Sequence, residues 1–134
     1  MIDLKILRRA VLIGIAFELA LVIGGTFYPR SRPGLLFVCM LVAAVAGMLY
    51  GRDLARGFGA AMLGGTLAGA ACGLTAVTAA HFAGISPEVY IPYGVLVTML
   101  TGAVGGFFGE MDARLRAYIV RKLMPDHSGG NSGQ

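Results

Sequence analysis

Residues 57–73 read GFGAAMLGGTLAGAACG, the most informative stretch of the 134-residue chain. Small residues recur in it at intervals of four: Gly57, Ala61, Gly65, Gly69 and Gly73. In an α-helix that spacing places all five on one face, which then carries almost no side chain. Because no hydrophobic force joins helices inside a membrane, such a face promotes association by letting two backbones approach closely. The stretch therefore predicts a transmembrane helix that packs tightly on another helix.

The same pattern recurs in two other apolar stretches. These are the stripes Ala43–Gly47–Gly51 and Gly94–Thr98–Gly102–Gly106. Striped faces of this kind serve either to pack the helices of one chain together or to join a second copy or a partner helix. The sequence leaves both uses open.

Composition places the chain in the membrane class. It is 57% hydrophobic and only 13% charged, with a mean hydropathy of +0.76, whereas soluble domains carry about 25% charged residues. These values exclude a cytosolic enzyme, a disulfide-rich secreted module and a disordered linker. The net charge of +4 is spread between apolar runs rather than gathered in one patch, so we expect no nucleic-acid partner. We predict a small polytopic membrane protein whose first partner is the lipid bilayer.

Four apolar stretches are long enough to cross a bilayer, which takes roughly 17–25 residues of helix. They cover about residues 10–28, 34–50, 58–85 and 89–108. The connections are short, so successive helices should be antiparallel neighbours. The predicted fold is an all-α integral membrane protein, a four-transmembrane-helix up-and-down bundle forming one domain over residues 1–124.

Basic residues predict the orientation. One side of a four-span protein would hold Lys5, Arg8, Arg9, Arg52, Arg56, Arg114, Arg116, Arg121 and Lys122. Only Arg30 and Arg32 fall on the other side. Since basic residues accumulate in the cytoplasm, both termini are expected there, in a bacterial inner membrane.

After the fourth span, residues 110–124 predict a short amphipathic helix on the cytoplasmic surface. Glu110–Arg114 and Asp112–Arg116 are favourable i,i+4 pairs. We expect lipid headgroups to contact the basic residues of this helix, namely Arg114, Arg116, Arg121 and Lys122. Residues 125–134 are expected to form a mobile polar tail.

Glu18 lies near the middle of the first span, where an acidic group costs about 2.5–3.5 kcal/mol on insertion scales. It is either a proton- or ion-handling carboxyl in a transport path, or a structural group that bonds a threonine or joins a partner subunit. The candidate neighbours at similar depth include Thr75, Thr98 and Thr101. His81 lies near the outer end of the third span, roughly 10 Å above Glu18 at 1.5 Å per residue. It is a weaker candidate for the same path.

A possible internal repeat relates the second span to the fourth. Residues 47–51 (GMLYG) and the Ala-Arg pair at 55–56 match residues 105–109 (GGFFG) and the Ala-Arg pair at 113–114. Both segments would run from outside to inside, as a duplicated hairpin requires, although such coincidences are common in a Gly/Ala-rich chain.

No catalytic, metal-binding or cofactor-binding arrangement is found. The chain has two histidines and two cysteines, without the spacing of a metal site. Cys39 and Cys72 fall inside apolar runs, where we expect them to be buried and apolar. The sequence predicts a protein that is not an enzyme and needs no cofactor.

The layout of four spans with a glutamate in the first resembles the small multidrug resistance transporters. The resemblance covers the layout and Glu18 only, since the aromatic pocket of that family includes tryptophan and this chain has none. Three functions remain. The first is helix–helix association, as a homo-oligomer or as a subunit or assembly factor of a membrane complex. The alternatives are a proton-coupled transporter or channel using Glu18, and a holin-like pore former.

Overall fold

The computed structural model describes residues 2–28, 32–85 and 90–123, and in these ranges it contains helices and no strand. The helices are α1 (Leu4–Phe27), α2 (Arg32–Leu54), α3 (Phe58–Phe82) and α4 (Tyr90–Leu123). All four are long and apolar enough to cross a membrane. The predicted all-helical class with four candidate spans is therefore confirmed. Arg30 and the tail 125–134 lie outside the described residues.

The first helix begins earlier than its apolar run. The Asp3 carboxylate accepts hydrogen bonds from the backbone N–H groups of Lys5 and Ile6, at 3.0 and 3.3 Å. A side chain that satisfies free N–H groups in this way starts a helix. The first turn of α1 is therefore fixed by a polar residue outside the predicted span.

A tight turn separates α2 from α3. Ala55 has a φ of 45° and Gly57 a φ of 116°, and only glycine adopts the second value without strain. Nothing lies within 4 Å of the position that a Cβ on Gly57 would take. Gly57 therefore serves the turn, whereas the pattern at intervals of four had assigned it to a packing face.

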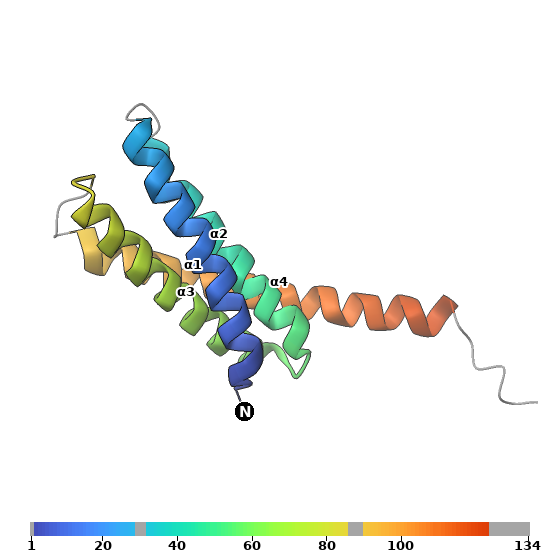
Figure 1. Ribbon diagram of the computed structural model, residues 1–134. Helices are drawn as coiled ribbons and strands as arrows, with labels where there is room; N and C mark the ends of the chain where they lie inside the picture. Colours follow the sequence, from blue (N-terminus) through green and yellow to red (C-terminus); the bar gives the residue numbers. More distant parts are fainter. Residues whose placement is uncertain (1, 29–31, 86–89, 124–134) are drawn as a thin grey trace, which may run out of the picture.

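The fourth helix continues without a break through the region predicted as a separate surface helix. Its C-terminal part, shown orange to red in Figure 1, extends away from the other three helices. Both predicted ion pairs are present, Arg114–Glu110 and Arg116–Asp112, each at 2.9 Å. Because nothing in residues 108–112 interrupts helical geometry, the two predicted segments form one helix.

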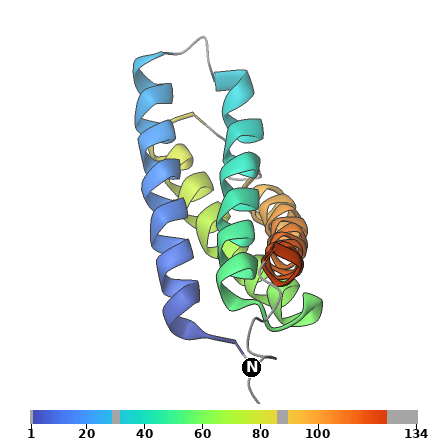
Figure 2. The same cartoon turned by 90° about the vertical axis from the view of Figure 1, so that its right-hand side faces the viewer.

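The helices are not equivalent in their packing. Helices α2, α3 and α4 each contact the other two, whereas α1 contacts α2 and α3 but not α4 within the described residues. Figure 2 shows α1 and α2 side by side, with α4 on the other side of α2. Helix α1 is therefore a peripheral helix on a tight group of three.

Small residues are buried and large apolar residues point outward. The fully buried positions include Ala43, Ala61 and Ala68, whereas Phe17 and Leu100 are more than 60% exposed. This distribution is opposite to that of a soluble core, where large apolar side chains are the most buried. It suits helices whose outer surface meets lipid and whose backbones touch.

Candidate functional site

The glycines of α2 lie against the backbone of α4. A Cβ added at Gly47 would overlap the carbonyl oxygen of Gly102, and one at Gly51 would overlap that of Gly106. On the other helix, a Cβ at Gly105 would overlap the carbonyl oxygen of Ala44. The two helices therefore touch main chain to main chain, as small residues at a membrane-helix crossing allow.

The stripe on α3 faces the same α4 segment, including the same Gly102 carbonyl. Added Cβ atoms at Gly65 and Gly69 would overlap the carbonyl oxygens of Gly102 and Thr98. In the same way, Gly106 lies against the carbonyl of Ala61. A Cβ on Gly73 would meet the Thr98 side chain, and one on Gly94 would lie 2.7 Å from Val77 Cγ2. Apart from Gly57, the striped positions thus pack the chain's own helices.

The segments of the possible repeat lie in the same interface. Gly47 and Gly51 pack against α4, and their counterparts Gly105 and Gly109 pack against Ala44 and Met48 of α2. Each segment therefore contributes glycines that face the other helix. This reciprocity is the arrangement that two related helices running in the same direction can form.

The most unusual group is Glu18. Its side chain is fully buried, and neither carboxylate oxygen has a hydrogen-bond partner among the described residues. Buried polar groups are nearly always hydrogen-bonded, and an intramembrane ionisable group is a candidate functional site by default. Glu18 is the only residue of α1, α2 or α3, within the described ranges, whose side chain leaves two buried oxygens unpaired.

Glu18 lies where α1 meets α2 and α3. It lies near both Cys39 of α2 and Cys72 of α3, which are free and buried as predicted. One turn earlier on α1, a Cβ on Gly14 would lie 2.5 Å from Cys72 Sγ and 3.2 Å from Ala46 Cβ. Gly14 therefore lets α1 approach closely enough to enclose the carboxyl.

The threonines considered as partners bond elsewhere. The Thr75 hydroxyl donates to the Ala71 carbonyl at 2.9 Å, and the Thr101 hydroxyl donates to Val97. The buried Thr98 hydroxyl donates to the carbonyls of Gly94 and Val95 at 3.0 and 2.9 Å. Each threonine thus satisfies its hydroxyl on its own helix, and Thr98 and Thr101 lie on α4, which α1 does not contact.

The remaining candidates lie at the helix ends. His81 is half-buried in the last turn of α3, with its ring 5.8 Å from that of Phe82. Arg114 stacks on Phe58 at 4.3 Å from the ring centroid. Arg116, Arg121 and Lys122 are exposed on the extending part of α4.

Sequence reasoning missed two buried groups. Glu110 is 2% exposed and accepts a hydrogen bond from Arg114 Nε at 2.9 Å. It continues the stripe of Gly102 and Gly106 by one more interval of four, a signal that could have revealed its burial. Tyr50, fully buried, covers Gly64, where a Cβ would overlap its ring.

Comparison with known protein families, curated proteins and solved structures finds no significant match. Among the described residues, no group of three or more His, Cys, Asp or Glu side chains could hold a metal ion. Glu18 and the helix contacts are therefore the features of the described residues that bear on function.

Proposed function

We propose that the protein is an integral membrane protein that moves protons or small cations across the bilayer, with Glu18 as the titrating carboxyl. All four helices span the membrane, and both termini face the cytoplasm. The observation that supports this function is the fully buried Glu18 carboxyl, with both oxygens unpaired among the described residues. Ionisable groups inside a membrane mark ion pathways and proton relays.

The structural alternatives for Glu18 are less well supported. A hydrogen bond to a threonine would use Thr75, Thr98 or Thr101, whose hydroxyls donate to carbonyls of their own helices. A bond to a partner subunit would require exposure, and the Glu18 side chain has none. The packing of α1 also favours movement. Because α1 contacts α2 and α3 but not α4 within the described ranges, a small shift of this peripheral helix could open a path to Glu18.

The proposal is tested by proton flux in liposomes that contain a pH-sensitive dye. A potassium diffusion potential should drive acidification faster with the wild-type protein than in protein-free vesicles, and the Glu18→Gln variant should abolish this difference. Glu110→Gln is the matched control, because it makes the same change at a carboxyl that already bonds Arg114. Wild-type flux equal to that of empty vesicles, or full flux from Glu18→Gln, would overturn the proposal.

Association is a second candidate, supported by the extending part of α4. Large apolar side chains are exposed there, including Leu115, Tyr118 and Ile119, on a segment that stands clear of the other helices (Figure 1). A second copy or a partner helix could cover them. The glycine stripes offer less support for association, since they already face the chain's own helices. Replacing Leu115 and Ile119 with Gln should reduce the oligomer mass in native mass spectrometry; an unchanged mass would exclude this surface.

A further inference from the structure

The seam between α1 and α2 carries two adjoining hollows of different chemistry. The first, at the end of the molecule that holds the N-terminus, is a cleft of about 50 Å³ whose lining includes Arg9, Arg52 and Asp53. The second is an apolar groove of about 230 Å³. Neither contains Glu18 in its lining, although the groove shares Gly14 and Ala46 with the packing around that residue.

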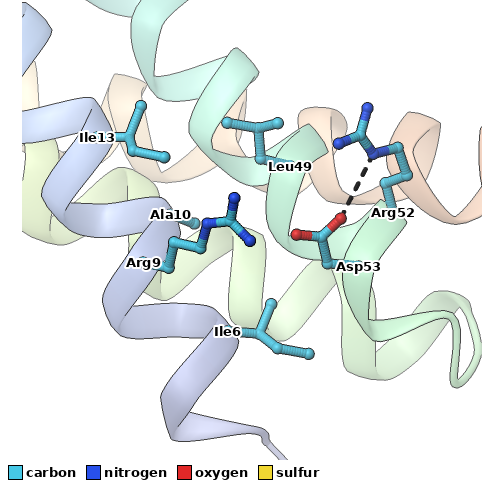
Figure 3. Close-up of a pocket in the computed structure, with 7 residues that line it drawn as sticks. All are labelled: Ile6, Arg9, Ala10, Ile13, Leu49, Arg52 and Asp53. Atoms are coloured by element: carbon cyan, nitrogen blue, oxygen red, sulfur yellow. Dashed lines mark hydrogen bonds and ion pairs between the residues drawn. The ribbon is translucent and has the colours of Figure 1, made fainter.

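Two arginines from different helices converge on the cleft. Figure 3 shows Arg9 reaching from α1 toward α2, while Arg52 and Asp53 extend from α2. Arg52 Nε lies 3.5 Å from Asp53 Oδ1, a distance too long for a strong ion pair. The guanidinium groups therefore keep donors for another acceptor. Guanidinium groups bind phosphate oxygens through paired N–H donors, and a cleft of this volume has room for a group of a few heavy atoms.

The wider surroundings favour an anion. Lys5, Arg8 and Arg56 are exposed at the same end of α1 and α2. The acidic residues nearby are Asp3, Asp53 and, on α4, Glu110. Asp3 is engaged as the cap of α1, and Glu110 is paired with Arg114. The net positive charge of this end favours an anionic group over a zwitterionic one.

The apolar groove continues directly from the cleft. Ile13 and Leu49 line the cleft. Gly14, the next residue on α1, and Ala46, three residues before Leu49 on α2, line the groove. Gly14 and Ala46 are buried and form a shallow floor. The lining of the seam thus changes from charged residues in the cleft to apolar residues in the groove.

The walls of the groove are formed by larger side chains. Phe17, Leu41 and Val45 line it and are at least half exposed. From Arg9 to Phe17 the seam covers about 12 Å at 1.5 Å per residue, which approaches the roughly 15 Å of hydrocarbon in one leaflet. A chain lying in the groove would therefore remain within a single leaflet.

We infer that the α1–α2 seam is a binding site for one anionic phospholipid. The phosphate lies between Arg9 and Arg52, and one acyl chain lies over Gly14 and Ala46. The inference requires the proposed membrane insertion but not the role of Glu18. A lipid bound here would contact both helices and so stabilise the packing of the peripheral helix α1 against α2.

The experiment is native mass spectrometry of the full chain released from nanodiscs that contain equal amounts of phosphatidylglycerol and phosphatidylethanolamine. The wild-type protein should keep one phosphatidylglycerol, and the Arg9→Gln/Arg52→Gln variant should retain it at least about tenfold less, as expected for losing two basic groups beside an anionic headgroup. The matched control is Arg8→Gln/Arg56→Gln, which removes the same charge from the same end but outside the cleft. It should keep most of the lipid.

A second variant tests the acyl-chain half of the site. Val45→Trp narrows the groove from its exposed rim and should reduce lipid retention while leaving both arginines in place. Equal loss in the cleft and control variants would overturn the site, because it would indicate general attraction to the surface. Retention of phosphatidylethanolamine equal to that of phosphatidylglycerol would overturn the anionic preference. Binding of free inorganic phosphate with full retention by Val45→Trp would overturn the lipid assignment.

Discussion

Gly102 is the residue whose substitution tests the helix packing best, because it lies between α2 and α3. A Cβ at this position would overlap the Gly65 carbonyl oxygen and would lie 2.9 Å from Gly69 Cα, well inside the 3.4 Å at which ordinary contact begins. All the atoms it meets belong to a backbone, so no side chain can rotate away. Helix α4 as a whole would have to move, and its contact with Gly47 on α2 would change too.

The size of the effect follows from two opposing terms. Forcing an extra methyl group into a close-packed interface costs about 1–3 kcal/mol. Replacing glycine with alanine inside a helix recovers up to about 1 kcal/mol through helix propensity. With the full propensity gain, we therefore expect the Gly102→Ala variant to lose about 0–2 kcal/mol of the free energy of unfolding.

The matched control is Gly24→Ala in α1. Nothing lies within 4 Å of a Cβ at Gly24, so this variant gains the propensity term without a clash. The difference between the two variants isolates the packing cost, about 1–3 kcal/mol. Titration with a denaturing detergent, followed by circular dichroism, measures both values. If Gly102→Ala proves as stable as Gly24→Ala, the backbone contact does not hold α3 and α4 together.

Three further predictions concern the enclosure of Glu18 and the packing of α2 on α3. Glu18→Met should leave the free energy of unfolding unchanged or raise it by up to about 3 kcal/mol, since it removes an unpaired buried polar group; a loss of stability in the same titration would mean that Glu18 has a structural partner. Gly14→Ala should destabilise the protein, and Cys72→Ala should restore part of that loss, because the new Cβ meets Cys72 Sγ at 2.5 Å; additive effects in the double-mutant cycle would contradict this contact. Gly64→Ala should displace the ring of Tyr50, which would increase its accessibility to a polar fluorescence quencher; an unchanged quenching constant would contradict the close approach.

Much of the helical architecture could be predicted from the sequence because membrane helices follow simple rules of length and hydropathy. The Glu110–Arg114 and Asp112–Arg116 pairs were predictable for the same reason, since they depend only on local spacing. Spacing also showed which glycines share a helix face. It could not show that Gly102 contacts the small-residue stripes of two helices, because that depends on how α2 and α3 are arranged around α4.

The environment of Glu18 was harder to predict. Hydropathy placed the carboxyl in the middle of a span, but several threonines occur at a similar depth. Thr98 and Thr101 lie on α4, which α1 does not contact in the part of the chain that the structure describes. Instead, Cys39 and Cys72 are near the carboxyl. The depth of a residue along a span can be predicted from the sequence. The direction in which its side chain faces depends on the helices packed around it.

The decisive measurement is pH-difference infrared spectroscopy of the protein reconstituted in lipid, compared with the Glu18→Gln variant. If Glu18 exchanges protons with water, the wild-type spectrum will contain a carboxyl band that changes with pH and is absent from the variant. A carboxyl band of Glu18 that stays constant over the whole pH range in which the protein remains folded would contradict a proton-handling role.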